Sequence, residues 1–260
     1  MKKIMAIAVI LASFGGGSAF SEEKKENSVD LGLGAFYRNS VYKKENHDEV
    51  LPVPMGGVRI GNFYFEAPLE AGYHFFKTEN LTLTAYGRYN IYTGYDPDDM
   101  IDEFKDMDKR GDDFHIGLRE KYNFGPLRTG IVSRISGDIS GKSDGLLARV
   151  EINQPVPLRK NVIILPYVAF EYMNDSYVDY YFGISREEAE KGINNGRKYD
   201  GDDVFNLEAG ITGVIQINES FKILANGNYK RYGDSISDSP LVEDRDIYTA
   251  GVGIIYSFKF

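Results

Sequence analysis

The sequence contains neither cysteine nor tryptophan. Without cysteine the chain can form no disulfide and cannot be a lipoprotein anchored through a lipidated cysteine. Beyond the N-terminal segment, no apolar run approaches the roughly 18 residues that a membrane-spanning helix needs. An excess of basic residues is also missing, because the formal net charge is −9, which argues against a nucleic-acid partner. These absences exclude helical membrane proteins and lipoproteins and argue against nucleic-acid binders.

The N-terminal residues 1–21 have the three parts of a secretory signal. Lys2 and Lys3 form a basic start, an apolar run follows from Ile4 to Phe14, and glycine, serine and alanine occupy 15–19. The apolar run is too short to cross a membrane as a helix. We expect cleavage after Ala19 or Ser21, with 22–28 as a charged lead-in in the periplasm and 29–260 as one folded domain.

The C-terminal segment alternates apolar and small residues over a length more than double that of an average strand. A strand this long matches the roughly 9 to 11 residues of a tilted strand that spans a bilayer. We therefore predict an all-β transmembrane antiparallel barrel, with a soluble β-sandwich as the alternative. The aromatic residues at the end resemble the signal that the barrel assembly machinery recognises in outer-membrane proteins. The outward face of this strand reads Tyr248, Ala250, Val252, Ile254, Tyr256, Phe258 and Phe260.

Short and long connections alternate along the second half, as in barrels with short periplasmic turns and long extracellular loops. Both termini then lie in the periplasm, so the strand number is even. Splitting 63–76 near Ala67 and Pro68 gives twelve strands, and ten is the alternative. We read 155–161 as a short turn. Because tryptophan is absent, tyrosine and phenylalanine near the strand ends are expected to form the two aromatic belts at the membrane surfaces.

The opposite strand faces carry charges of both signs, which we predict to point into the lumen. The simplest interpretation is that they form internal ion pairs that partly fill the lumen, and the alternative is a narrow solute path. Glu120 is an exception, since alternation places it on the lipid face. The predicted inward residues are Arg38, Arg59, Glu70, His74, Arg88, Arg119, Lys121, Arg134, Arg149, Glu151, Glu171, Glu208, Lys222 and Lys230.

No catalytic, cofactor or metal site is expected. The acidic stretch 96–113 is interpreted as a solvated loop rather than a site for divalent cations, and it lacks the final glutamate of an EF-hand. An outer-membrane lipid hydrolase of the Ser/His type is the enzymatic alternative. None of the three histidines, His47, His74 and His115, has a recognisable pairing in sequence with serine and a carboxylate.

Two segments in the predicted loops, here called blocks, carry a family resemblance. The Leu51-Pro52-Val53-Pro54 segment and the C-terminal Tyr256-Ser257-Phe258 carry it as well. The first block contains Tyr181, Phe182, Gly183 and Ser185, and the second contains Gly233, Asp234, Asp238, Ser239 and Pro240. The first also has the Ser-x-x-Glu form of a helix capping box at Ser185. With these segments the whole of 29–260 resembles the MltA-interacting protein family (MipA/OmpV) of outer-membrane proteins.

The resemblance implies location in the outer membrane, in contact with its lipids and lipopolysaccharide. It further implies a scaffold between a lytic transglycosylase and a murein synthase, with a small-solute channel or a surface adhesin as alternatives. The family offers no catalytic residues to transfer.

Overall fold

The structure is a computed structural model that describes residues 27–260 except 47, 68, 91 and 92. The predicted signal and most of the predicted lead-in lie outside the described residues. The strands are β1 Ser28–Asn39, β2 Asp48–Ile60, β3 Phe63–Glu66, β4 Glu70–Lys77, β5 Leu81–Asn90, β6 Asp113–Phe124, β7 Thr129–Asp138, β8 Leu146–Asn153, β9 Val156–Arg159, β10 Val162–Met173, β11 Val204–Gln216, β12 Phe221–Arg231 and β13 Asp246–Lys259.

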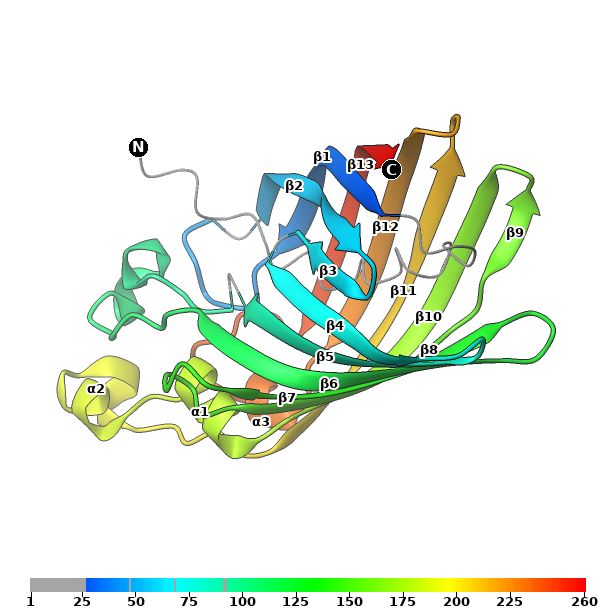
Figure 1. Ribbon diagram of the computed structural model, residues 1–260. Helices are drawn as coiled ribbons and strands as arrows, with labels where there is room; N and C mark the ends of the chain where they lie inside the picture. Colours follow the sequence, from blue (N-terminus) through cyan, green and yellow to red (C-terminus); the bar gives the residue numbers. More distant parts are fainter. Residues whose placement is uncertain (1–26, 47, 68, 91–92) are drawn as a thin grey trace.

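The strands form a closed antiparallel barrel (Figure 1). Each strand pairs with its neighbour, and β1 pairs with β13 to close the wall. β8 and β9 both pair with β10 and act as two halves of one strand, so the wall has twelve strands. The prediction of twelve is confirmed, including the split between β3 and β4, although Pro68 itself lies outside the described residues. The reading of 155–161 as a turn is wrong, because the chain resumes pairing at Val156.

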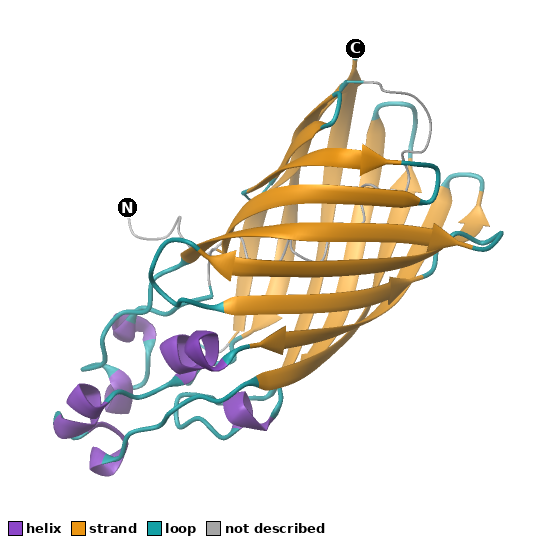
Figure 2. Cartoon of the chain, turned by 60° about the horizontal axis from the view of Figure 1, so that its bottom comes forward, coloured by secondary structure: helices purple, strands orange, loops and turns teal. Residues whose placement is uncertain are grey.

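The two ends of the barrel differ in construction. At the turn end, short connections join the strands, and at the loop end the longer connections carry the helices of the described residues (Figure 2). None of the helices in the described part of the chain has the length and apolar content needed to cross a membrane. The helices are η2 Pro97–Asp99, η3 Asp102–Phe104, α1 Asp175–Phe182, α2 Arg186–Glu190, η4 Ile193–Gly196 and α3 Asp234–Ser237.

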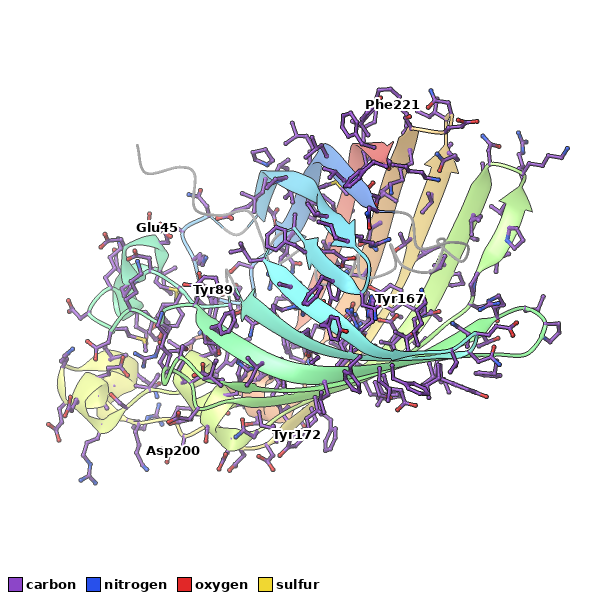
Figure 3. All side chains as sticks on the ribbon, viewed as in Figure 1. Glu45, Tyr89, Tyr167, Tyr172, Asp200 and Phe221 are labelled. Carbon is purple, nitrogen blue, oxygen red and sulfur yellow. The ribbon has the colours of Figure 1, made fainter. Side chains whose placement is uncertain are left out.

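The outer surface of the barrel is apolar and follows the predicted alternation. On β13, Tyr248, Val252, Ile254 and Phe258 are exposed, while Thr249 and Ile255 between them are buried. Glu120 is exposed on this surface, as alternation predicts, and nothing in the structure explains it. Aromatic rings lie toward both ends of the strands, with the half-buried Tyr172 and the exposed Phe221 labelled at opposite ends in Figure 3. Toward the loop end these include Tyr37, Phe205 and Tyr248, and toward the turn end Phe75, Phe76, Tyr122, Phe124 and Phe258.

Inside the barrel, an apolar cluster fills the space beside β1, β2 and β13. It consists of Phe36, Val53, Met55 and Ile255. The cluster needs small residues on the facing strand: a Cβ on Gly251 would lie 2.0 Å from the Phe36 ring, and one on Gly253 would lie 2.1 Å from the Met55 sulfur. The glycines on the inner face of the last strand therefore make room for side chains from β1 and β2.

Within the described residues, the N-terminal part of β2, residues 48–55, is an edge of the sheet. β3 pairs only with 57–60 of β2, so 48–55 pair with β1 alone. Gly56 accepts a hydrogen bond from Ala67 on the β3 side, so even-numbered residues of β2 present their peptide groups to that side. Pro52 and Pro54 are even-numbered residues of β2 as well. Proline has no backbone N–H, so no donor is left unpaired at these two positions. The two prolines thus fit the edge on which they lie.

Candidate functional site

The interior carries charged side chains in two connected groups. The first is centred on Glu70 of β4, which is only 5% exposed. Arg88 binds one carboxylate oxygen of Glu70 at 2.5 Å, and Arg119 binds the other at 2.9 Å. The Tyr64 hydroxyl donates to Glu70 at 2.8 Å. One carboxylate therefore pairs with two guanidinium groups, and these three groups together carry a net positive charge.

The second group lies farther along the same inner wall, on β8, β10 and β11, and β7 separates it from the first group. The Arg149 guanidinium contacts Glu208 at 2.6 Å and Glu151 at 3.1 Å, and the Tyr167 hydroxyl donates to Glu208 at 2.7 Å. These side chains are 10–21% exposed, so the pairs retain contact with water. Further inward ion pairs are Arg59–Glu66, Lys222–Asp30 and Lys230–Glu171.

These contacts join many of the residues that the sequence predicts to point inward, among them Glu70, Arg88, Arg119, Arg149, Glu151 and Glu208. His74 lies among them and its Nδ1 is 2.8 Å from the Thr84 hydroxyl. Arg134 of β7 is directly opposite Arg119 on one side and Arg149 on the other, but belongs to neither group. Sequence alternation assigned each residue to a face. It could not assign partners, because these depend on register and on reach across several strands.

The loop end is closed by a compact hydrophobic cluster, here called the cap. Its side chains come from the loops after β1, β5, β10 and β12 and from the adjoining strand ends. The interpretation of 96–113 as a solvated loop is wrong, because Met100, Phe104 and Met107 are buried in the cap while the acidic residues between them face outward. The buried members are Val41, Tyr42, Tyr95, Met100, Phe104, Met107, Met173, Tyr177, Val178, Tyr181, Phe182, Ile184, Ala189, Ile193, Val204, Tyr232, Ile236, Leu241, Val242 and Ile247.

The two sequence blocks that carry the family resemblance meet in the cap. The Ser239 hydroxyl donates to the backbone carbonyl of Phe182 at 2.6 Å, across 57 residues of sequence. Ser185 caps α2, and the predicted capping box is confirmed by its reciprocal hydrogen bonds with Glu188. Gly233 donates to Asn206 on β11 through its backbone N–H at 3.1 Å. The blocks therefore form internal contacts of the cap.

One buried ion pair joins two cap loops. The Arg110 guanidinium contacts both carboxylate oxygens of Glu188, at 2.8 and 2.9 Å, and its Nε donates to the carbonyl of Tyr180 at 2.7 Å. Burial by itself would raise the pKa of Glu188, but hydrogen bonds from the Ser185 backbone and from Arg110 outweigh it and hold that pKa below its usual value. Burial also raises the pKa of Tyr42 well above its usual value.

A histidine at the loop end contacts both a serine and a carboxylate. His115 Nε2 lies 2.9 Å from Asp113, and the Ser136 hydroxyl lies 3.4 Å from Nδ1. This grouping is not recognisable in the sequence. Strand pairing produces the contacts, since Ser136 and His115 lie on adjacent strands. All three side chains are buried inside the barrel, away from the lipid face where a lipid ester would lie.

Asp138 lies beside Asp113 and His115, and the three could offer ligand atoms to a metal. Their oxygens already have donors. Asp138 accepts from the backbone N–H groups of Ser140, Lys142, Ser143 and Asp144, and Asp113 accepts from Asn90, Ser143 and His115. This cluster organises the loop after β7.

The comparisons with known proteins agree with this architecture. A family model described as "MltA-interacting protein MipA" matches residues 31–258. The chain belongs to this family. The MltA-interacting protein of Escherichia coli (strain K12) is 25% identical over 261 residues, covering 98% of each chain. Outer membrane protein OmpV of Vibrio cholerae is 27% identical over 161 residues, covering 62% of this chain and 60% of the relative.

Solved structures with a similar fold were also found. They include Pseudomonas putida OprB, with TM-score 0.46, 9% identity and coverage of 94% and 97%, and the NanC porin, with TM-score 0.45, 9% identity and coverage of 87% and 98%. The protein is located in the outer membrane. By the arrangement common to such barrels, the turn end faces the periplasm and the cap faces outward.

Proposed function

We propose that this MipA-family barrel is a non-enzymatic scaffold that binds murein enzymes at its periplasmic turn end. The observation that carries the proposal is the similarity, over 98% of both chains, to a relative named for its interaction with MltA. The proposed partners are a lytic transglycosylase and a murein synthase, both of which act in the periplasm. Within the described residues, the turn end is the part of such a barrel that faces them.

Two structural features support a scaffold over an open pore. The cap covers the loop end with a buried hydrophobic cluster, and ion pairs cross-link the interior. Both features narrow any continuous water path. The turn end presents exposed charged residues that a partner can contact, namely Lys77, Glu79, Arg159, Lys160 and Glu219.

Site-directed photo-crosslinking in intact cells tests the scaffold. A photoreactive residue at Glu79 or Lys160 is expected to capture a transglycosylase or a murein synthase. The matched control is the same residue at Asp200, which is exposed at the loop end (Figure 3). Absence of murein enzymes from the turn-end crosslinks, together with unchanged murein composition after deletion of the protein, would reject the scaffold.

A narrow solute channel is the second candidate. The inward ion pairs keep between 7% and 28% of their side-chain surface exposed, which favours a hydrated interior. Planar-bilayer recording separates the candidates: steady single-channel currents from the purified barrel would favour the channel, and a silent barrel that co-purifies with a murein enzyme would favour the scaffold.

A further inference from the structure

Three arginines lie in a row across neighbouring strands on the inner face. Arg119 of β6 pairs in register with Arg134 of β7, and Arg134 pairs in register with Arg149 of β8. Like charges directly opposite each other on adjacent strands are destabilising. The row therefore requires negative charge close to each of its members.

The two outer arginines have that charge. Arg119 contacts Glu70 at 2.9 Å, and Arg149 contacts Glu208 at 2.6 Å. Arg134 differs from both, since it has no hydrogen bond or ion pair with any residue in the described ranges. Its side chain is only partly buried, so solvent reaches it.

The carboxylates nearest to Arg134 are already engaged. Glu70 and Glu151 are the acidic groups that act on it electrostatically, against Arg119 and Arg88 of like sign. Both oxygens of Glu70 are taken by Arg88 and Arg119, and both oxygens of Glu151 are taken by Arg149 and Asn153. Four arginines, at 88, 119, 134 and 149, therefore face three carboxylates, at 70, 151 and 208, and Arg134 is the arginine of the four that no carboxylate of the described residues contacts directly.

We propose that Arg134 is the centre of an anion-binding site inside the barrel, which takes a small oxyanion such as a phosphate or carboxylate group. A guanidinium offers two parallel N–H donors that match the oxygens of such a group. Because the cap closes the loop end, the anion enters from the turn end. The site is independent of the proposed scaffold, since it lies in the lumen and needs no periplasmic partner.

Calorimetric titration of the folded, purified full-length barrel with inorganic phosphate tests the site, with acetate as the carboxylate probe. Ionic strength is held constant with chloride, because screening alone changes the apparent affinity. Wild type is expected to bind phosphate saturably, and Arg134→Gln to weaken binding about tenfold or more, the loss of one charge-assisted pair. Arg134→Lys should fall between them, because it keeps the charge but not the planar fork.

Arg59→Gln is the matched control, since it removes an inward arginine that already has a partner, Glu66 at 2.9 Å. It should bind phosphate as wild type does. The relative affinities for phosphate and acetate then distinguish a phosphorylated from a carboxylated natural ligand. The proposal is overturned if neither anion binds wild type saturably, or if Arg134→Gln binds as tightly as wild type. Should Arg134→Gln fail to fold, unchanged affinity in Arg134→Lys would overturn it as well.

Discussion

The guanidinium of Arg110 and the carboxylate of Glu188 lie 2.8 Å apart, although 78 residues separate them in sequence. Arg110 follows β5 and Glu188 follows β10, so the pair ties together two loops of the cap. Glu188 is fully buried and Arg110 nearly so. The pair is consequently a point where one substitution should loosen the cap and leave the barrel wall intact.

We expect Glu188→Gln to make the loop 174–203 more sensitive to protease by about tenfold, because a hydrogen bond between charged groups contributes on the order of 1.5 to 3 kcal/mol. Trypsin cleavage after the exposed Arg186 or Lys191, followed by mass spectrometry, measures the effect. Glu190→Gln, exposed on the same helix, is the control and should behave as wild type. Equal cleavage rates in the two variants would show that the pair does not hold the cap.

The cap should also loosen in acid. The pKa of Glu188 is lower in the folded protein than its usual value of 4.5, so its contribution is complete above about pH 4.5 and is lost as the pH falls through the lowered folded value. Hydrogen exchange of cap peptides between pH 6 and pH 3 should show this loss. In Glu188→Gln the acid-dependent loss should be smaller. An identical pH profile in that variant would assign the effect to other groups.

Glu70→Gln should destabilise the barrel itself. The variant leaves Arg88 and Arg119 without a charged acceptor, and removing one partner of a buried ion pair costs about 3 kcal/mol. Urea unfolding in lipid vesicles, followed by circular dichroism, measures the change. Glu66→Gln is the control, because its pair with Arg59 is more exposed and should contribute about 1 kcal/mol or less. Equal losses in the two variants would contradict the central role of Glu70.

The edge prolines provide a fourth prediction. Replacing both Pro52 and Pro54 with valine adds two N–H donors to an edge without a partner strand. Each unsatisfied donor costs about 1 to 3 kcal/mol, so the urea midpoint in vesicles should fall. Pro126→Val, in an exposed turn, controls for the effect of proline on the unfolded chain. An unchanged midpoint in the double variant would mean that the edge is satisfied in another way.

Alternation in the sequence predicted the wall well, because lipid outside and charge inside impose a strict period of two on each strand. The alternation did not predict the role of residues that lie outside the strands or that contact other strands across the interior. Met100, Phe104 and Met107 have the i, i+4, i+7 spacing of an apolar helix face, which an analysis based on a period of two does not detect in an acidic segment. The glycines at 251 and 253 predicted a small inner face, but not that Phe36 and Met55 from other strands would occupy the space.

Alternation predicts a face for each interior charge, but it does not predict the partner of that charge. Whether an arginine is neutralised depends on the register of three or four strands at once, and a shift of two residues would give Arg134 a different set of neighbours. The candidate anion site therefore became visible only when the register was known. The C-terminal residues Tyr256, Phe258 and Phe260 remain a predicted recognition signal for assembly.

The cap also contacts the seam at which β1 pairs with β13 and closes the barrel. Asn39 at the end of β1 donates to the carbonyl of Asp246 at 3.0 Å and accepts from the backbone of Tyr248 at 2.7 Å, while Tyr42 and Val242 form a bridge just above. These contacts join segments about 200 residues apart and form together with the pairing of the first and last strands. Separating β1 from β13 at the outer end therefore also breaks contacts of the cap.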